Sequence, residues 1–279
     1  MPPPRARLYA RTMGATETVE MMAVRGHQIR VAHRPGSGRP LLLCNGIGAS
    51  IDLLQPFVDA LDPGIPVVRF DVPGVGGSPL PRRPYVFASL AGMLGALLDQ
   101  LRYGDVDVLG ISWGGGLAQQ FAFQNPYRCR RLVLVSTGTG WMMVPARPRV
   151  LSRMIGPRRY RDPEYAKSIA AEIYGGSLRD RPELATVLLD SHSPVGSRRG
   201  YLLQLLAASG WTSLPFLRLI RQPTLIIAGT DDPIIPLINA RMMARLMPSA
   251  ELHTYDDGHL GLVVRADELA PRIAQFLRA

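Results

Sequence analysis

Short, mostly apolar runs alternate with amphipathic stretches along most of the chain. Apolar runs without a polar side are typical of strands that are buried on both faces of a parallel sheet. Such runs predict central strands over residues 41–44, 67–70, 106–111, 132–135 and 224–228. The pattern also predicts strands over residues 18–24, 28–34 and 251–255, and helices over residues 86–102, 237–247 and 266–278. Because strands and helices alternate from residue 41 onward, we expect an α/β fold with a mostly parallel central sheet flanked by helices.

This alternation is interrupted once. Residues 139–216 contain apolar segments and helical periodicity but no convincing buried strand. We interpret them as a helical cap inserted between two parts of an α/β core, residues 1–138 and 217–279. Part of the apolar surface of this cap is expected to pack on the core, and the remainder to line a substrate pocket. The candidate substrate contacts are Trp141, Met142 and Met143.

A glycine-flanked serine directly follows one of the predicted strands. Residues 110–114 read Gly-Ile-Ser-Trp-Gly, a G-x-S-x-G pattern that lies between an apolar strand and a helix. In this context the pattern is typical of a strained turn that lifts a serine hydroxyl above the sheet. Side chains at positions 110 and 114 would collide with the neighbouring strand and helix. We therefore expect Ser112 to be a nucleophile; the alternative is a glycine-rich loop that only joins strand to helix.

Another glycine-containing turn follows the strand over residues 41–44. Residues 45–49 read Asn-Gly-Ile-Gly-Ala, and glycines at this place allow backbone N–H groups to point into a cavity. Hydrolases with a serine turn of this kind place one oxyanion donor here and another directly after the nucleophile. We therefore expect the N–H groups of Ile47 and Trp113 to form an oxyanion hole. The alternative is an ordinary strand-to-helix turn.

A serine nucleophile needs a base, and the base needs a third group that fixes its tautomer. Of the five histidines, only His259 lies in a glycine-flanked loop after the last predicted strand, so it is the candidate base. The candidates for the acid are Asp231, Asp232, Asp256 and Asp257. We favour Asp232 over Asp231, since it lies in the loop after a buried strand and just before a proline. The other two, close to His259 in the chain, are interpreted as turn formers.

Composition and charge narrow the class of protein. The chain has 279 residues, 47% of them hydrophobic, which predicts a sizeable buried core. No apolar run approaches the length of a membrane span, and no apolar segment follows the arginines at the amino terminus, so we expect a cytoplasmic protein. The net charge of +10 comes almost entirely from arginine. The arginines are spread along the chain, with a denser patch over residues 147–161 and no recognition motif, so we expect no nucleic-acid partner.

Nothing in the sequence suggests a cofactor or a metal ion. No group of histidine, cysteine, aspartate and glutamate residues has the spacing of metal ligands. The glycine-rich residues 71–78 lack the spacing of a dinucleotide-binding motif, and prolines follow where a helix would have to begin. Cys44 and Cys129 form no metal or redox motif and are interpreted as small buried hydrophobic residues.

Several of these stretches together resemble one family of α/β-hydrolases, the intracellular depolymerases of medium-chain-length poly(3-hydroxyalkanoates). The resembling stretches are residues 45–49, 70–78, 110–115, 173–176, 210–213, 222–224, 231–239 and 256–260. The more specific features are Trp113 in the serine motif and Asn45, where many hydrolases carry histidine. The resemblance implies a serine hydrolase that cleaves the ester bonds of a storage polyester at the surface of cytoplasmic granules. It places the nucleophile on Ser112, the acid on Asp232 and the base on His259.

Ester hydrolysis through an acyl-enzyme is therefore the main hypothesis, with a polyester or a small ester as substrate. A small-molecule carboxylesterase and a hydrolase of carbon–carbon bonds share this core and triad, so the fold cannot separate them. Acyl transfer to another acceptor is open to the same acyl-enzyme. A non-catalytic granule-binding protein would not need an intact set of serine, aspartate and histidine, which argues against that class. The sequence carries no signal for an oligomeric state.

Overall fold

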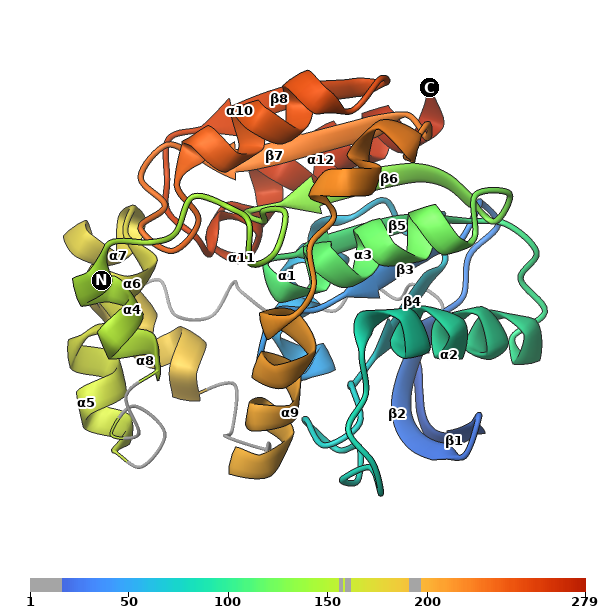
Figure 1. Cartoon of the computed structure of the whole chain (residues 1–279), viewed down its shortest axis with the longest axis horizontal. Helices are drawn as coiled ribbons and strands as arrows, with labels where there is room; N and C mark the ends of the chain where they lie inside the picture. Colours follow the sequence, from blue (N-terminus) through green and yellow to red (C-terminus); the bar gives the residue numbers. More distant parts are fainter. Residues whose placement is uncertain (1–16, 156–157, 159–161, 191–196) are drawn as a thin grey trace, which may run out of the picture.

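One eight-stranded sheet lies at the centre of the computed structural model, which describes residues 17–155, 158, 162–190 and 197–279 (Figure 1). The strands are β1 (Thr18–Val24), β2 (His27–Arg34), β3 (Leu41–Cys44), β4 (Val67–Phe70), β5 (Val106–Ile111), β6 (Cys129–Val135), β7 (Thr224–Gly229) and β8 (Ala250–Tyr255). Their order across the sheet is β1-β2-β4-β3-β5-β6-β7-β8. β2 pairs antiparallel with β1 and with β4, and all other neighbours pair parallel. The expected mostly parallel sheet is confirmed.

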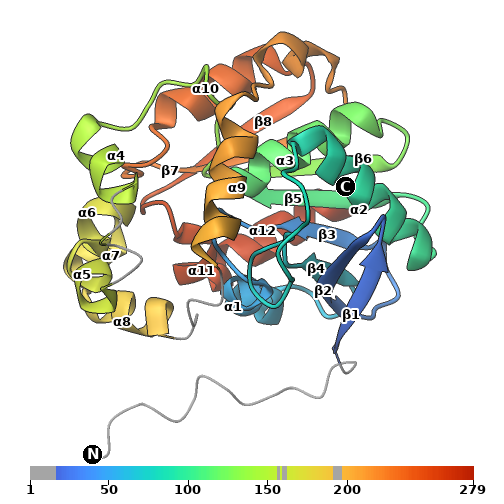
Figure 2. The ribbon, with the colours of Figure 1, turned by 60° about the horizontal axis from the view of Figure 1, so that its bottom comes forward.

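Residues 139–216, which lie between β6 and β7, are called the inserted segment below. Its helices are α4 (Pro148–Ile155), α5 (Pro163–Ser168), α6 (Ala170–Tyr174), α7 (Ser177–Asp180), α8 (Glu183–Asp190) and α9 (Arg198–Ser209). The 3-10 helix η3 (Leu214–Leu219) begins in the inserted segment and ends after it. In its described part, the one β pairing is an isolated bridge between Gly140 and Thr212. Figures 1 and 2 show α4 to α8 gathered beyond one end of the sheet, whereas α9 stands apart from them.

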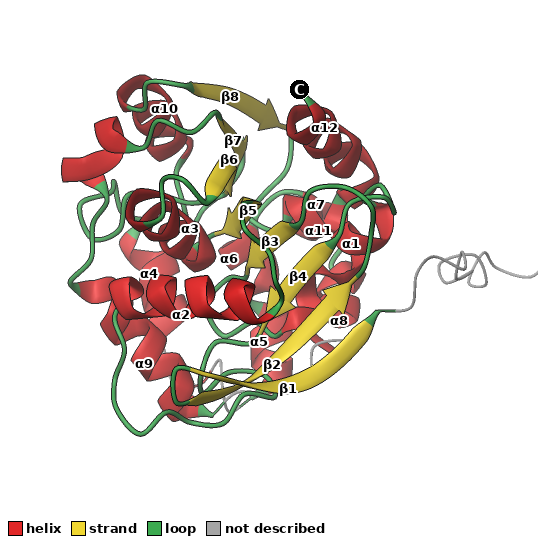
Figure 3. Ribbon diagram, turned by 90° about the vertical axis from the view of Figure 1, so that its right-hand side faces the viewer, coloured by secondary structure: helices red, strands yellow, loops and turns green. Residues whose placement is uncertain are grey.

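Helices cover both faces of the sheet, as Figure 3 shows. On one side lie α2 (Phe87–Gln100), α3 (Trp113–Gln124) and α10 (Leu237–Leu246), and on the other η1 (Ile51–Leu54), α1 (Gln55–Ala60), α11 (Gly261–Val264) and α12 (Ala266–Arg278). Each side has its own group of buried apolar side chains between helices and sheet. Because successive side chains of a strand point to opposite faces, β3 contributes Leu42 to the first group, and Leu41 and Leu43 to the second. This two-sided burial explains why the central strands have no polar side.

The helix boundaries lie close to those that the hydrophobic pattern predicts. The helix expected over residues 86–102 ends at Gln100, and Arg102 then takes a φ of 59°, outside the right-handed helical region.

Among the helices of the described residues, none combines the length and the apolar character that crossing a bilayer requires. His192, which is interpreted from the sequence as a structural residue of the expected cap, and the amino-terminal residues 1–16 lie outside the described residues.

The topology brings four loops to one edge of the sheet. β3, β5, β7 and β8 run in the same direction, so their carboxyl ends lie along the same edge. The loop after β3 contains residues 45–49, and Ser112 directly follows β5. Asp232 and His259 lie in the loops after β7 and β8. In open α/β sheets this edge is where ligands bind.

Candidate active site

Ser112 lies between the last residue of β5 and the first residue of α3, in a strained backbone conformation. Its φ is 54° and its ψ is −121°, a combination that non-glycine residues rarely adopt. A Cβ at Gly110 would lie 2.3 Å from the carbonyl oxygen of Gly114, and a Cβ at Gly114 would lie 2.1 Å from that of Cys44. Only glycine fits at these two positions, so the backbone of α3 can approach β5 and β3 closely enough to form the turn.

The turn after β3 runs beside this serine. A Cβ at Gly46 would lie 3.7 Å from the Cβ of Ser112. The Asn45 side chain fixes the turn, since its Oδ1 accepts from the N–H of Gly46 at 2.8 Å and its Nδ2 donates to the carbonyl of Ser50. Ile47 is the next residue of this turn, and Trp113 follows Ser112 as the first residue of α3. The Trp113 N–H therefore has no acceptor within the helix. Of the two predicted oxyanion donors, Trp113 is next to Ser112 in the chain, whereas Ile47 belongs to the turn that runs beside the serine.

The structure joins Asp232 to His259. The Nδ1 atom of His259 lies 2.7 Å from the Oδ2 atom of Asp232, and the exposed fractions of the two residues are only 4% and 8%. The other carboxylate oxygen, Oδ1, accepts from the N–H groups of Ile234 and Ile235, both at 2.9 Å. A carboxylate can only accept, so Nδ1 carries the proton of the neutral imidazole and Nε2 keeps a free lone pair. The arrangement leaves His259 able to take a proton at Nε2.

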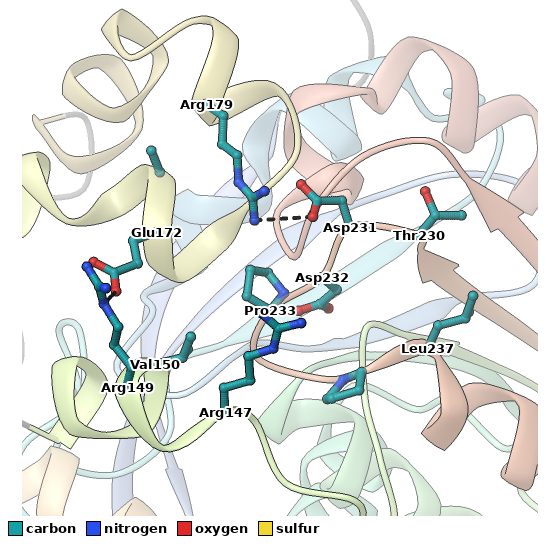
Figure 4. A pocket seen from close by; sticks show the side chains of 12 residues that line it. Arg147, Arg149, Val150, Glu172, Arg179, Thr230, Asp231, Asp232, Pro233 and Leu237 are labelled. Carbon is teal, nitrogen blue, oxygen red and sulfur yellow. Dashed lines mark hydrogen bonds and ion pairs between the residues drawn. The ribbon is translucent and has the colours of Figure 1, made fainter.

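Asp231, the neighbour of Asp232 in the chain, is bonded to the inserted segment in the described structure. Its Oδ2 accepts from the N–H of Gly176 at 2.7 Å, and its Oδ1 pairs with Arg179 at 3.2 Å. Figure 4 shows this ion pair, which links α7 to the loop after β7. The Asp231 carboxylate therefore binds the inserted segment, through Gly176 and Arg179, and not the histidine.

Asp256 and Asp257 both lie in the turn after β8, as interpreted from the sequence, and the structure gives Asp257 a further contact. Asp256 is exposed and accepts from the Thr230 hydroxyl at 3.0 Å, which fits a surface turn. Asp257 is buried, and its carboxylate accepts from the N–H and the hydroxyl of Ser177 in the inserted segment. Sequence reasoning missed this contact because the two residues are 80 positions apart in the chain.

Two tyrosines support the histidine loop. Tyr174 belongs to the resembling stretch 173–176, but neither tyrosine was assigned a role from the sequence. The carbonyl of Tyr174 accepts from the N–H of His259 at 2.8 Å, and the two rings are stacked with centroids 6.4 Å apart. The hydroxyl of Tyr255 donates to the carbonyl of Gly258 at 2.9 Å. Burial raises the pKa of Tyr255 well above its usual value, so the phenol keeps the proton that it donates. The Gly175-Gly176 pair after Tyr174 was the available signal of a close backbone approach.

The three candidate substrate contacts differ in exposure. The exposed fractions of Trp141 and Met142 are 63% and 44%. Met143 is half-buried and packs against Ala146, Val150 and their apolar neighbours in the inserted segment. Trp141 and Met142 therefore lie on an outer surface of the protein.

A hollow of about 750 Å³ lies on the outer side of the Asp232 loop, between this loop and the inserted segment (Figure 4). It is lined by Arg147, Arg149, Val150, Ala171, Glu172, Arg179, Thr230, Asp231, Asp232, Pro233, Pro236 and Leu237. Asp232 is among these residues, whereas Ser112 and His259 are not. Within the described part of the chain, no three histidine, cysteine, aspartate or glutamate side chains are grouped so that they could hold a metal ion.

Comparisons with known proteins place this geometry among hydrolases. A family profile described as alpha/beta hydrolase fold matches residues 39–266. A poly(3-hydroxyalkanoate) depolymerase of Ectopseudomonas oleovorans is 53% identical over 254 residues, which cover 90% of this chain and 89% of that protein. The 2-hydroxy-6-oxononadienedioate/2-hydroxy-6-oxononatrienedioate hydrolase 1 of Dechloromonas aromatica is 30% identical over 240 residues, which cover 80% of this chain and 79% of that protein. The crystal structure of the enol-lactonase from Burkholderia xenovorans LB400 matches with a TM-score of 0.79 at 23% identity, covering 93% of this chain and 100% of that chain. At this identity the structural match concerns the fold alone.

The close approach at Gly114 predicts a stability effect. Gly114→Ala should lower the free energy of unfolding by about 2–4 kcal/mol, because the new methyl group would force the backbone of α3 away from β3. Urea unfolding measures this loss. Gly104→Ala is the control, since a Cβ there meets nothing within 4 Å; it should change the free energy by less than about 1 kcal/mol. Equal effects of the two substitutions would contradict the close approach.

Proposed function

The chain belongs to the α/β-hydrolase family and, within it, to the poly(3-hydroxyalkanoate) depolymerases, and from this premise we propose that it cleaves the ester bonds of a poly(3-hydroxyalkanoate) through an acyl-enzyme on Ser112. The observation that carries the proposal is the buried hydrogen bond between Asp232 and His259, 2.7 Å long. It orients an imidazole in a loop at the sheet edge from which the strained turn of Ser112 also extends. The identity of 53% to a depolymerase selects a polyester as the substrate.

The proposed reaction has two halves. In the first, Ser112 Oγ attacks the ester carbonyl while His259 Nε2 takes the hydroxyl proton. The N–H groups of Ile47 and Trp113 stabilise the resulting oxyanion. The intermediate collapses, His259 returns the proton to the leaving 3-hydroxyl group, and the acyl group stays on the serine. In the second half, water takes the place of the serine hydroxyl, and the free acid and Ser112 are released.

Asp232 serves this reaction through the histidine. Its carboxylate holds the proton of His259 on Nδ1, so that Nε2 faces the reaction as an acceptor. It also stabilises the imidazolium that forms in each half of the reaction. The two backbone N–H bonds to its Oδ1 fix the carboxylate, so the imidazole is held in one orientation before the substrate arrives.

We assign the inserted segment, residues 139–216, as a cap over a core formed by residues 1–138 and 217–279. Helix α9 supports this role, since it contacts both predicted oxyanion turns. The Oε1 atom of Gln204 accepts from the N–H of Gly48 at 2.7 Å, and its backbone carbonyl accepts from the Trp113 indole at 2.9 Å. A movement of α9 would thus shift both the turn of residues 45–49 and Trp113.

The outer surface around Trp141 and Met142 is the proposed contact with an insoluble polyester. These two side chains and Val144 are large, apolar and exposed, and all three belong to the cap. A water-soluble ester has no need of such a surface, whereas a polymer granule offers a broad apolar partner. We therefore assign the protein to the surface of cytoplasmic storage granules.

A carbon–carbon bond hydrolase is the second candidate. The observation that favours it is the identity of 30% to the 2-hydroxy-6-oxononadienedioate/2-hydroxy-6-oxononatrienedioate hydrolase 1 of Dechloromonas aromatica. The two candidates make opposite predictions for purified protein. A depolymerase releases hydroxy acids from a purified polyester with medium-length side chains. A carbon–carbon hydrolase would leave the polyester intact and cleave a ring-cleavage product instead, and this result would overturn the proposed function.

The nucleophile can be tested with a serine-directed probe. Ser112→Ala should abolish labelling by a fluorophosphonate and lower the hydrolysis of a soluble ester by about four to six orders of magnitude, because no acyl-enzyme can form. Ser209→Ala is the control, since this hydroxyl is exposed and bonds only to the carbonyl of Leu206 in the described structure. Activity of Ser112→Ala within tenfold of the wild type would rule out the serine as nucleophile.

The two neighbouring aspartates provide a matched pair. Asp232→Asn should lower kcat by about 10³–10⁴-fold, because an amide beside Nδ1 favours the wrong tautomer of His259. Asp231→Asn should lose less than about tenfold, since its contacts go to Gly176 and Arg179. Steady-state kinetics on a soluble ester compares them. Equal losses, or a larger loss for Asp231→Asn, would show that Asp232 is not the acid of the reaction.

Adsorption to polyester tests the outer surface. Trp141→Ser/Met142→Ser should weaken partitioning onto purified granules by at least about tenfold, because burial of apolar surface contributes about 25 cal/mol per Å². Hydrolysis of a short soluble ester should stay nearly unchanged. Val19→Ser/Met21→Ser is the control pair, with exposed fractions of 50% and 48% on β1. Unchanged partitioning of the first pair would remove these residues from the binding surface.

A further inference from the structure

The turn between α6 and α7 is wedged between the two loops that carry Asp232 and His259. It consists of Gly175 and Gly176, between Tyr174 at the end of α6 and Ser177 at the start of α7, and the two glycines have positive φ values of 65° and 53°. A Cβ at Gly175 would lie 2.2 Å from the carbonyl oxygen of Asp231, and a Cβ at Gly176 would lie 2.0 Å from the backbone nitrogen of Gly258. From the other side, a Cβ at Gly258 would lie 2.0 Å from the carbonyl oxygen of Tyr174. The main chains of the three segments are therefore in direct contact.

Hydrogen bonds fix this contact in both directions. Toward the acid loop, the N–H of Gly176 donates to Asp231 at 2.7 Å. Toward the histidine loop, the N–H of His259 donates to the carbonyl of Tyr174 at 2.8 Å. The two loops are also joined to each other, because the N–H of Asp231 donates to the carbonyl of Asp257 at 3.1 Å. The turn thus helps to set where the candidate base lies relative to the candidate acid.

Asp257 is at the centre of these contacts. Its Oδ1 accepts from the N–H groups of Ser177 at 2.8 Å and Gly258 at 2.6 Å, and its Oδ2 accepts from the Ser177 hydroxyl at 2.5 Å. The residue is 2% exposed, and these hydrogen bonds in the described structure come from neutral donors. A buried carboxylate is costly unless its hydrogen bonds are satisfied. A surface turn alone would not require one, as the exposed Asp256 next to it illustrates.

We infer that Asp257 is a positioning residue for the reaction. It acts through Ser177 and the α6–α7 turn to hold His259 in place relative to Asp232. The inference rests on the function proposed above. Asp257 contacts the inserted segment on one side and the residue before His259 on the other, so loss of its carboxylate releases the histidine loop. A displacement of about 1 Å in a catalytic group can cost about a hundredfold in rate. The inserted segment is therefore part of the apparatus that aligns the acid and the base.

The test compares Asp257→Asn and Ser177→Ala with Asp256→Asn on a soluble ester. The number of active sites is counted by fluorophosphonate titration, so that kcat is expressed per active site. Asp257→Asn should lower kcat per active site by about tenfold or more, with KM within about threefold, and Ser177→Ala should have a smaller effect in the same direction. Asp256→Asn should change kcat by less than twofold. A purely structural role would lower the melting temperature or the titrated fraction and leave kcat per site unchanged, which would overturn the inference.

A double variant and a spectroscopic signal make the test independent of any one substitution. If the two residues act through one contact, Asp257→Asn/Ser177→Ala should lose no more than the single variant with the larger loss, whereas additive losses would contradict a shared contact. The proton between His259 and Asp232 should give a low-field NMR resonance that shifts in Ser177→Ala and stays in place in Asp256→Asn. If Asp257→Asn does not fold, Ser177→Ala decides alone, and an unshifted resonance with unchanged kcat overturns the inference. Failure of the proposed function is recognised separately, because the wild type would then hydrolyse no ester.

Discussion

A serine held at a positive φ is the constraint on which the rest of this structure depends. The conformation of Ser112 is possible because α3 approaches β5 and β3 so closely that only glycine fits at positions 110 and 114. That approach needs glycine near the carboxyl end of β5, at position 110, and a helix that begins directly after Ser112. The surrounding sheet holds β5 in place for this contact, since the strand is buried along its whole length and pairs parallel with β3 and β6. The strain of one residue is thus balanced by the packing of three strands and a helix.

The other groups of the site are placed by the same topology. The parallel strands end at the same edge of the sheet, so the groups that follow them lie there although they are far apart in the chain. These groups are the turn of residues 45–49, Ser112, Asp232 and His259. The sheet sets their approximate position, but it does not fix the side chains to the accuracy that proton transfer needs. That last step depends on contacts within the loops, above all the bond from His259 to Asp232 and the two backbone bonds to the other oxygen of this carboxylate.

The sequence predicted what depends on local pattern and missed what depends on distant pairs. The runs 41–44 and 132–135 identify strands because both faces of the sheet are covered, and the order of serine, aspartate and histidine follows from the order of the loops. The pairing of Asp232 with His259 was predicted on this basis, and the structure joins the two; their catalytic roles stay predictions. The bond between Asp257 and Ser177 had no such signal, because a buried carboxylate and a surface turn former look alike in sequence. The Gly175-Gly176 pair is visible in the sequence, but nothing in the sequence identifies the backbone that it contacts.

The contact between the α6–α7 turn and the two loops also has a consequence for how the protein loses activity. Helices α5, α6 and α7 have only 6, 5 and 4 residues, so they hold their shape through packing and not through their own helical stability. Segments of this kind open locally at a lower free energy than a central sheet does. Such an opening would release Tyr174 and Ser177 from the histidine loop while the eight strands stay paired. If this contact aligns His259 as inferred above, activity should be lost by local opening of these short helices before the sheet unfolds.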